Sequence, residues 1–344
     1  MKTIIVILDG LSEEKINELN MTPLEYAETP TLDNIIKKGT HGKRKFHLKN
    51  REPDSLSCIL SILGVNENKI PNNRAYLEAL AAGINIEEDE AVLRCNLISA
   101  KNNLLESFNG AGLTNKEMDE ASNNVNTSGV KFHHLRDYRN ILVLKKTHDL
   151  LSLKTKAPHE NLGRNIYELL SECMEIEILN KFINNNQFIM NNKQYMFYPW
   201  GISETVTLPS FYSLHNKTCS VVCSADIVKG IAKAMNIDMP LLKNATGDVD
   251  TDIKEKAKAV LQEIYTHDVV IAHINGTDEV SHRKDLHGKI KFIEKIDKEF
   301  IKEIYENITD TRLIILSDHQ TSSITGKHEK GFVDYIKWDS GDVH

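Results

Sequence analysis

The chain contains a set of aspartate and histidine residues whose types and spacing suit divalent metal ions. The set consists of Asp9, Asp278, His282, Asp318, His319 and His328. Carboxylate oxygen and imidazole nitrogen together are typical ligands of zinc, manganese and iron. Because this set exceeds what one ion needs, it predicts two ions, and two neighbouring ions can clamp a phosphoryl group from both sides. The chemistry that these residues indicate is therefore phosphoryl transfer.

Each of these residues alone has a simpler interpretation. Asp9 precedes a glycine and could form only a turn. Asp278 and His282 have the spacing of a surface pair on a helix, and Asp318 could cap a helix. His273 could serve only to orient a neighbour. The occurrence of such residues in three separate segments favours the metal site over three independent coincidences.

A phosphoryl-transfer site also needs a nucleophile, and Ser55 is the candidate. It follows Pro53 and Asp54 at the point where a turn enters an apolar helix. The helix dipole and a bound metal ion would both lower the pKa of its hydroxyl. On spacing alone Ser57 and Ser61 compete with it, and without the metal ligands Ser55 would be read as a helix cap.

Three short apolar runs rich in β-branched residues precede the candidate ligands. They are residues 2–8, 268–274 and 312–317, and each is followed by polar residues. Such runs are typical of strands buried on both faces of a parallel sheet. Helical patterns lie between them, at residues 31–38, 225–235, 252–265 and 287–308. The alternation predicts an α/β sheet, and the carboxyl ends of its parallel strands would bring the ligands to one edge.

The middle of the chain has a different character. Beyond about residue 88 it contains shorter strand-like and helical pieces, and residues 180–192 are rich in asparagine. We interpret this part as an insertion within one sheet domain. The predicted division is a metal-binding core of residues 1–88 and 203–344, with a smaller inserted α+β domain of residues 89–202.

Composition excludes several classes of protein. The net charge of -7 lacks the basic surplus that nucleic-acid binding exploits, so no nucleic-acid partner is expected. The apolar stretch at residues 4–8 ends at Asp9, too soon for a signal peptide or a membrane span, so we expect a cytoplasmic protein with no membrane partner. No oligomeric state is predicted. The cysteines lack a C-x-x-C pair and predict buried free thiols; they are Cys58, Cys95, Cys173, Cys219 and Cys223.

Further motifs follow one another along nearly the whole chain. They include T-P-L-E-Y-A-E-T-P-T-L-D at 22–33, N-R-A-Y-L-E-A at 73–79, R-C-N-L at 94–97, Y-R at 138–139, P-H at 158–159, A-D-I-V-K-G at 225–230 and A-T-G at 245–247. In order and spacing this set resembles the archaeal-type cofactor-independent (2,3-bisphosphoglycerate-independent) phosphoglycerate mutases of the alkaline phosphatase superfamily. Relatives proposed to be homoserine kinases belong to the same group. So many ordered matches are far more specific than any single motif.

The resemblance implies a fold, an activity and a set of metal ligands. The fold would be an alkaline-phosphatase-like three-layer core with a central, mostly parallel sheet and an inserted α+β domain. The activity would be the interconversion of 3-phosphoglycerate and 2-phosphoglycerate through a phosphoserine at Ser55. Two divalent ions are implied, manganese first, with zinc, magnesium or cobalt as alternatives. One ion would be held by Asp9, Ser55, Asp318 and His319, and the other by Asp278, His282 and His328.

The resemblance also implies that the inserted domain grips a small phosphorylated metabolite. Arg139 and Arg94 are the candidates there, with Arg74 and Lys229 on the core side. Guanidinium groups bind carboxylate and phosphate as bidentate forks. The simpler interpretation of each is a surface cation or a structural ion pair.

The sequence departs from the family at positions near the nucleophile and the substrate. The family's P-G-S-D reads Pro53-Asp54-Ser55-Leu56 here, so a carboxylate precedes the serine and the one after it is absent. Asn140 replaces the histidine of Y-R-H. These departures leave open a divergent phosphatase or phosphotransferase acting on another small phosphorylated metabolite. A metal-stabilised homologue without activity would have lost ligands or the nucleophile, and none is lost.

Overall fold

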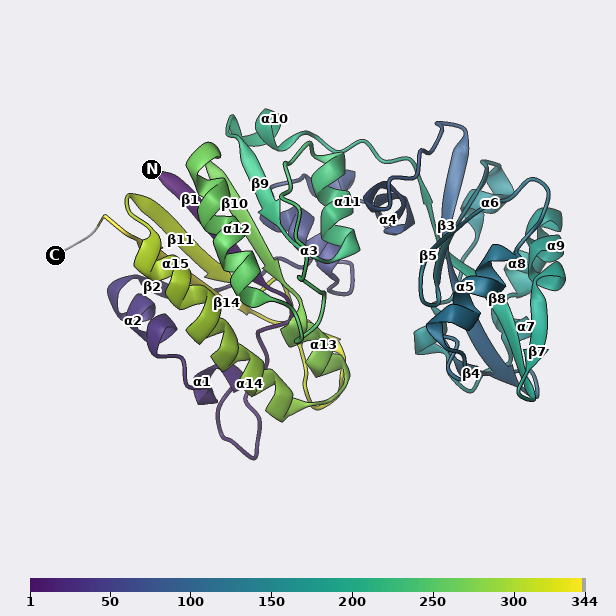
Figure 1. Ribbon diagram of the computed structural model, residues 1–344, viewed down its shortest axis with the longest axis horizontal. Coiled ribbons are helices and arrows are strands. Elements are labelled where there is room, and N and C mark those ends of the chain that lie inside the picture. The colour runs from purple at the N-terminus through teal and green to yellow at the C-terminus, as the bar shows by residue number, and fades with distance from the viewer. Residues whose placement is uncertain (342–344) are drawn as a thin grey trace. The chain divides into compact units, whose positions relative to one another are not determined.

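The computed structural model describes residues 1–341, which form two compact units. The first unit comprises Met1–Ile70 and the described residues from Thr207 onward, and the second comprises Pro71–Val206 (Figure 1). The second unit begins before the predicted position 89 because helix α4 (Ala75–Ala81) packs on strand β3 (Glu90–Lys101) through Ala75 and Ala79. The assignment of metal binding to one part and substrate gripping to the other stays a prediction.

The first unit is built on a six-stranded sheet in the order β2-β14-β11-β1-β10-β9. The strands are β1 (Lys2–Leu8), β2 (Thr40–Arg44), β9 (Cys219–Val222), β10 (Val269–Ile274), β11 (Thr311–Leu316) and β14 (Val333–Asp339). Neighbours from β11 to β9 are parallel, whereas β14 and β2 join antiparallel at one edge. The three apolar runs read from the sequence are the adjacent strands β1, β10 and β11, which confirms the mostly parallel sheet.

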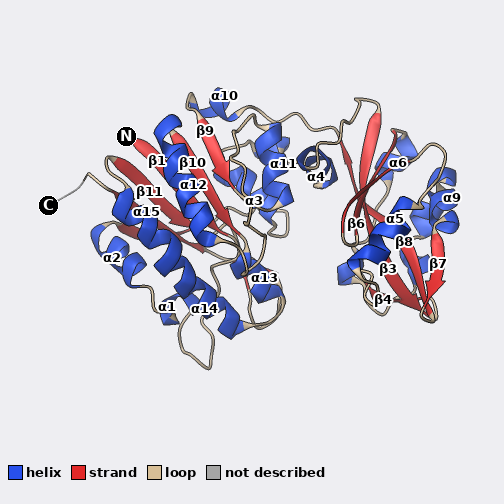
Figure 2. Cartoon of the chain, in the orientation of Figure 1, coloured by secondary structure: helices blue, strands red, loops and turns tan. Residues whose placement is uncertain are grey.

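Helices cover both faces of this sheet, which makes the three layers expected from the sequence (Figure 2). One face carries α2 (Pro30–Lys38), α12 (Ile253–Thr266), α14 (Leu286–Ile296) and α15 (Lys302–Asn307). The core beneath them contains Ile4, Val270 and Leu313 from the strands with Val260 and Phe300 from the helical layer. Helices α3 (Ser55–Ile62) and α11 (Asp226–Ala234) pack against each other on the other face. The apolar strands are thus buried on both sides, as their continuous hydrophobic sequence requires.

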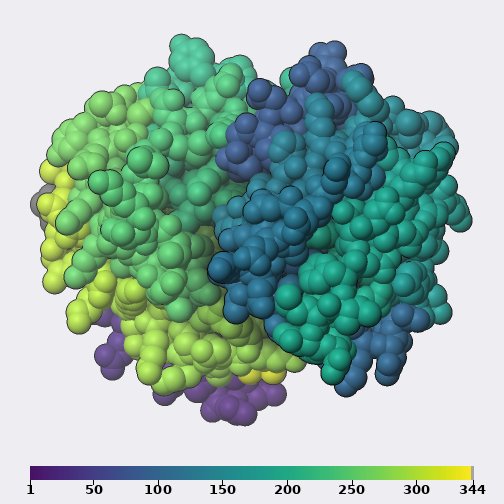
Figure 3. Space-filling view, turned by 45° about the vertical axis from the view of Figure 1, so that its right-hand side comes forward, coloured from purple at the N-terminus to yellow at the C-terminus, as the bar shows by residue number. Residues whose placement is uncertain are grey.

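Strand register decides where the first unit can place a site. Ile7 of β1 is level with His273 of β10 and with Leu316 of β11. The three parallel strands therefore end together, and the residues that follow them emerge at the same edge of the sheet. Figure 3 shows one face of the first unit, and residues from the later part of the chain, drawn in green to yellow, form most of that face.

The second unit is an antiparallel sheet with helices, which confirms the α+β class of the insertion. Its strand order is β5-β6-β3-β8-β7, with β4 beside β3. The strands besides β3 are β4 (Leu104–Ser107), β5 (Lys131–Arg136), β6 (Arg139–Lys145), β7 (Gln187–Met190) and β8 (Lys193–Glu204). The helices around its core include α5 (Asn115–Asn123), α6 (His148–Ser152), α7 (Ile166–Leu169), α8 (Ser171–Glu175) and α9 (Glu177–Asn185). Leu97, Phe182 and Phe197 are fully buried between these layers.

The five cysteines are in the state that the sequence predicts. All five cysteines lie in the described part of the chain, and each is a buried free thiol. This agrees with the absence of paired cysteine motifs. Within residues 1–341, none of the helices combines the length and the apolar character needed to cross a membrane.

Candidate metal centre and nucleophile

The predicted ligands lie directly after the three central parallel strands. Asp9 follows β1, and Asp318 stands two residues after the end of β11. After β10 the chain enters α13 (Gly276–His282), whose first turn carries Asp278 and whose last residue is His282. Because these strands end level with one another, segments far apart in the sequence meet at one edge of the sheet.

The first group of ligand-type side chains consists of Asp9, Asp318 and His319, and all three are buried. The Nε2 atom of His319 lies 3.3 Å from Asp9 Oδ1 and 3.4 Å from Asp318 Oδ2. Among the described residues, neither of these carboxylate oxygens has a hydrogen-bond partner. A buried carboxylate oxygen without a donor is costly, and a cation held between these atoms would remove that cost.

The second group consists of Asp278, His282 and His328. The Nε2 atom of His282 lies 3.1 Å from Asp278 Oδ2, and that of His328 lies 3.4 Å from Asp278 Oδ1. The two imidazole Nε2 atoms are 3.2 Å apart. Separations of this size are those of neighbouring ligand atoms around one small cation, so the geometry fits a metal ion here as well.

Backbone carbonyls orient both histidines of the second group. His282 Nδ1 lies 2.9 Å from the carbonyl oxygen of Gly326, and His328 Nδ1 lies 2.8 Å from that of Pro53. A carbonyl only accepts, so each Nδ1 carries the proton that it donates. In the neutral ring, Nε2 then carries a free lone pair that is turned toward Asp278, which is the arrangement that a metal-binding histidine needs. Without a metal ion, the hydrogen bond to Asp278 raises the pKa of His282 to about 9, so metal binding must displace that proton.

The two groups adjoin each other, and the negative charge between them is high. Asp9, Asp278 and His319 offer ligand atoms that all lie within 4.8 Å of one another. Burial and the nearby carboxylates of Asp318 and Asp278 raise the pKa of Asp9 well above its usual value. Carboxylates crowded in this way repel each other unless cations lie among them. The residues present therefore fit two divalent ions.

His273, for which the sequence predicts only an orienting role, lies beside the first group. It is fully buried, and its Nε2 atom lies 3.3 Å from Asp9 Oδ2. Burial lowers the pKa of His273 to about 4, so its ring is neutral at neutral pH. Asn275 donates a 3.3 Å hydrogen bond from Nδ2 to the same Asp9 oxygen. The hydrogen bond from Asn275 restricts the orientation of the Asp9 carboxylate, whereas both ring nitrogens of His273 lack a hydrogen-bond partner among the described residues.

Ser55 is the serine that the structure brings to the ligands. It is the first residue of α3, and its Oγ lies 3.3 Å from His319 Nε2. The hydroxyl of Ser57 instead turns back and donates to the carbonyl oxygen of Asp54 at 3.3 Å. The geometry thus distinguishes two serines that spacing alone left equal.

Asp54, the departure that precedes the serine, is engaged locally. Its Oδ1 accepts a 2.7 Å hydrogen bond from the backbone nitrogen of Ser57, so it is the N-cap of α3. Its Oδ2 lies 3.0 Å from Nε of Arg51. The carboxylate that the sequence placed next to the nucleophile therefore has a structural role of its own.

This cap gives a stability prediction. Replacing Asp54 by Ala leaves the backbone nitrogen of Ser57 without its acceptor, so the free energy of unfolding should fall by about 1 kcal/mol. Asp54→Asn keeps a capping oxygen and should lose only a few tenths of that amount. Urea unfolding of the two variants and the wild type measures the difference. Equal stability of Asp54→Ala and the wild type would contradict the capping role.

Two of the predicted substrate-binding cations, Arg94 and Arg74, meet on one carboxylate. Arg74 lies in the second unit and not on the core side, where the sequence placed it, because the second unit already begins at Pro71. Nε of Arg94 lies 2.9 Å and Nε of Arg74 lies 2.8 Å from the two oxygens of Glu78. The Arg94 guanidinium also stacks 4.0 Å from the Trp200 ring centroid. Burial and the charge of Arg74 lower the pKa of Arg94 to about 10. One carboxylate shared by two guanidinium groups leaves a net positive charge at this place.

The other two predicted cations have looser contacts. Arg139 Nη1 lies 3.3 Å from Asp137 Oδ2, and its guanidinium lies 4.4 Å from the Tyr138 ring centroid. Lys229 belongs to α11 of the first unit, where Nζ lies 3.9 Å from Asp226 Oδ1. Both side chains have about 40% of their surface exposed. They are thus accessible cations rather than buried structural ion pairs.

Asn140, which replaces the family's histidine, is a buried structural residue. Its Oδ1 lies 2.7 Å from His134 Nδ1 and accepts a 3.3 Å hydrogen bond from Ser122 Oγ. Its Nδ2 donates to the carbonyl oxygen of Tyr138 at 3.1 Å. The Asn140 side chain therefore links the turn and the strand that carry Arg139 to neighbouring groups.

Sequence reasoning missed Thr321, which touches both ligand groups. Its Oγ1 lies 2.6 Å from Asp278 Oδ1 and 3.1 Å from His319 Nδ1. A threonine has no spacing pattern of its own, so only its position two residues after His319 could have drawn attention to it.

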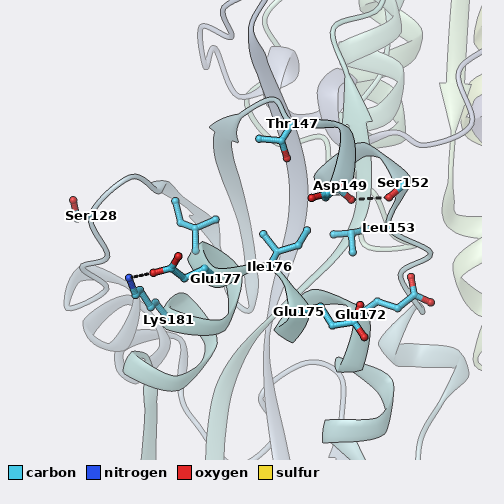
Figure 4. A pocket seen from close by; sticks show the side chains of 11 residues that line it. Ser128, Thr147, Asp149, Ser152, Leu153, Glu172, Glu175, Ile176, Glu177 and Lys181 are labelled. Carbon is cyan, nitrogen blue, oxygen red and sulfur yellow. Dashed lines mark hydrogen bonds and ion pairs between the residues drawn. The ribbon is translucent and has the colours of Figure 1, made fainter.

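A cavity of about 830 Å³ lies elsewhere, on the second unit (Figure 4). Its lining includes Asp149, Glu172, Glu175, Glu177 and Lys181, and Glu177 forms an ion pair with Lys181. None of the predicted site residues lines it. The candidate site is therefore defined by converging ligands at the sheet edge, not by this cavity.

Comparison with known proteins identifies the class to which this fold and site belong. The chain is a member of the metalloenzyme superfamily, whose family model matches residues 1–340. Membership agrees with the ligand groups at the sheet edge and confirms the use of metal ions at the level of the superfamily. The resemblance read from the motifs is thereby confirmed.

Two relatives that match nearly the whole chain carry a more specific name than the superfamily. The chain is 28% identical to "2,3-bisphosphoglycerate-independent phosphoglycerate mutase 1" of Methanocaldococcus jannaschii, over 98% of this chain and 88% of the relative. It is 29% identical to the protein named 2,3-bisphosphoglycerate-independent phosphoglycerate mutase in Methanococcus aeolicus, over 98% and 89%.

Solved structures share the fold. A protein from Pyrococcus horikoshii superposes with a TM-score of 0.77 at 23% identity, over 98% of this chain and 87% of that one. The cofactor-independent phosphoglycerate mutase from Thermoplasma acidophilum gives a TM-score of 0.59 at 16% identity, over 99% and 90%. These likenesses confirm the predicted fold class.

Proposed function

We propose that this protein is a metal-dependent, 2,3-bisphosphoglycerate-independent phosphoglycerate mutase. It interconverts 3-phosphoglycerate and 2-phosphoglycerate through a phosphoserine at Ser55. The observation that carries the proposal is the position of Ser55 Oγ, 3.3 Å from His319 Nε2 at the edge of the first ligand group. The names of the relatives that cover nearly the whole chain support the same activity. Such an enzyme would act in glycolytic carbon metabolism in the cytoplasm.

The proposed ligands follow from the two groups. Asp9, Ser55, Asp318 and His319 would hold one divalent ion, and Asp278, His282 and His328 would hold the other. Manganese is the ion that we propose, with zinc, magnesium and cobalt as alternatives that accept the same oxygen and nitrogen ligands. When bound, the ions supply positive charge that lowers the pKa of the serine hydroxyl and polarises the phosphoryl oxygens.

The chain's own residues would carry out the transfer in two steps. The Ser55 oxygen forms a bond to phosphorus while the bond from phosphorus to one substrate oxygen breaks, and that oxygen leaves with the serine proton. Glycerate stays bound and turns. Its other hydroxyl then takes the phosphoryl group from Ser55 and returns a proton to the serine. The amino terminus of α3, where Ser55 is the first residue, favours negative charge on the phosphoserine.

Retention of glycerate separates a mutase from a phosphatase, and the predicted substrate-binding cations would provide it. Arg139 and Arg94 would grip the carboxylate and the phosphate, supported by Arg74 and Lys229. Glu78 neutralises only one of the two arginines that it contacts. Arg94 is also held flat by the Trp200 ring, which reduces the conformational freedom that it loses when an anion binds.

The second candidate is a phosphatase or phosphotransferase acting on another small phosphorylated metabolite. Leu56 in place of the family's carboxylate favours it. The charge of Asp54 is a second argument for it, but this argument is weakened because the Asp54 carboxylate caps α3 and pairs with Arg51. The mutase is therefore preferred.

Phosphorus NMR tests the proposal directly. The manganese-loaded protein is incubated with 3-phosphoglycerate alone, and we expect a resonance of 2-phosphoglycerate to grow without free phosphate. The same protein treated with a chelator is the control and should leave the substrate unchanged. Free phosphate in place of 2-phosphoglycerate would show a hydrolase, and an unchanged spectrum with the loaded protein would reject both activities on this substrate.

A further inference from the structure

Thr321 is a buried residue that contacts a ligand from each of the two groups. It belongs to β12 (Gln320–Thr321), and its exposed fraction is 0%. Its hydroxyl oxygen lies 2.6 Å from Asp278 Oδ1, in the second group, and 3.1 Å from His319 Nδ1, in the first. Thr321 thus links two sets of ligands that come from different strands of the sheet.

The chemistry of these three groups fixes the direction of both hydrogen bonds. A carboxylate only accepts, so the single hydroxyl proton of Thr321 is donated to Asp278. The Thr321 oxygen is then an acceptor toward His319, so the proton of that ring lies on Nδ1. The Nε2 atom of His319 is consequently unprotonated, and it faces Asp9 and Ser55. One hydroxyl therefore selects the tautomer of one ligand and orients the carboxylate of another.

A buried ion pair holds the backbone on which Thr321 stands. Nζ of Lys289 donates to the carbonyl oxygen of Thr321 at 2.8 Å and lies 3.0 Å from Glu13 Oε2. The other oxygen of Glu13 accepts from the backbone nitrogen of Ser323 at 2.6 Å. Lys289 is fully buried, and Glu13 is 5% exposed. A buried pair of this kind adds little stability against an apolar replacement, so its use here is to fix the position of the segment.

Gly10 leaves the space that the Thr321 hydroxyl occupies. Its φ is +60°, and a Cβ added there would lie 2.5 Å from Thr321 Oγ1 and 2.6 Å from Asp278 Oδ1. Any other residue at this position would push the hydroxyl and the carboxylate apart. The glycine after Asp9 is thus required by the contact between Thr321 and Asp278 as well as by its turn.

From these contacts we infer that Thr321 is a positioning residue that couples the two proposed metal positions. The inference rests on the proposed function, because it takes the two ligand groups to be metal sites. Loss of the hydroxyl frees Asp278 to turn and allows His319 to carry its proton on Nε2. Both changes act against metal binding, one in each group. Removing one hydroxyl should therefore weaken both positions, although Thr321 itself is not a ligand.

Metal titration of the full chain tests this coupling without measuring activity. The metal-free wild type, Thr321→Val and Thr321→Ser are titrated with Mn²⁺ by calorimetry, and their Co²⁺ absorption spectra are compared. Thr321→Val keeps the shape of the side chain and should lower the affinity of both positions by about 10- to 100-fold. Thr321→Ser keeps the hydroxyl and should stay close to the wild type. Thr311→Val, at a buried threonine that is the first residue of β11 and so lies at the opposite end of that strand from the ligands, is the matched control and should bind metal normally.

The possible results separate this inference from the proposed function. Wild-type affinity in Thr321→Val, or a loss at one position only, would overturn the coupling and leave the metal centre intact. A wild type that binds no Mn²⁺ would overturn the metal centre and the coupling together. If circular dichroism shows that Thr321→Val does not fold, Thr321→Ala is titrated with Mn²⁺ instead, and its affinities have the same meaning for the inference. Weakening of both positions with recovery in Thr321→Ser supports the inference.

Discussion

Replacement of Ser55 by Ala should abolish turnover of 3-phosphoglycerate. The variant lacks the oxygen that takes the phosphoryl group. The hydroxyl of Ser57 cannot replace it as it stands, because it donates to the carbonyl oxygen of Asp54 and does not face His319. We expect kcat to fall by about 10⁴-fold or more, as happens when an enzyme loses its nucleophile. The protein should also lose the phosphoserine that mass spectrometry of an acid-quenched wild-type reaction would detect. Fold and stability should change little, because Asp54, not Ser55, caps the helix.

Two neighbouring serines provide matched controls for this experiment. Ser57→Ala and Ser61→Ala remove hydroxyls from the same helix, two and six residues after Ser55. Ser57 is fully buried, and its hydroxyl is occupied by the Asp54 carbonyl. Both variants should keep turnover and the phosphoserine. Turnover that persisted in Ser55→Ala, or a phosphoserine found at Ser57 or Ser61, would move the nucleophile and reject the proposed mechanism.

The sheet and the position of the site could be predicted because both depend on local sequence. The runs that form β1, β10 and β11 are continuously apolar since these strands are covered on both faces. Polar residues directly after such strands must emerge at the carboxyl edge of the sheet. The sequence therefore predicts that Asp9, Asp278 and Asp318 lie close together, and in the structure Asp9 shares one ligand group with Asp318 and another with Asp278.

Other features could not be predicted because they depend on partners distant in sequence. Strand β14 mixes polar and apolar side chains, and the edge strand β2 is largely exposed, so neither resembles the buried runs. The role of Thr321 depends on its contact with Asp278, which lies 43 residues earlier in the chain. The start of the second unit depends on the packing of α4 against β3. The spacing of residues predicts which side chains emerge at the end of a strand. It does not predict which other side chains contact and orient them.

Replacement of Arg139 by Ala should affect the second transfer, from Ser55 to glycerate, more than the first transfer, from the substrate to Ser55. The Arg139 side chain is about 40% exposed, and its guanidinium lies beside the Asp137 carboxylate and the Tyr138 ring, so it can turn to an anionic substrate. A charge-assisted hydrogen bond is worth about 1.5 to 3 kcal/mol, so mutase turnover should fall by about 10- to 100-fold. Glycerate that is no longer held leaves the phosphoserine behind, and water then takes the phosphoryl group.

The ratio of 2-phosphoglycerate to free phosphate is the decisive quantity, because a merely destabilised enzyme would lose both products together. Phosphorus NMR measures the two products in one sample, and the ratio should fall in Arg139→Ala while formation of the phosphoserine continues. Arg164→Ala removes an exposed arginine of the same unit, whose Nη1 donates to Asn161 at 2.9 Å, and should leave the ratio unchanged. An unaltered ratio in Arg139→Ala would take this residue out of the substrate grip and leave Arg94, fixed between Glu78 and Trp200, as the next arginine to replace.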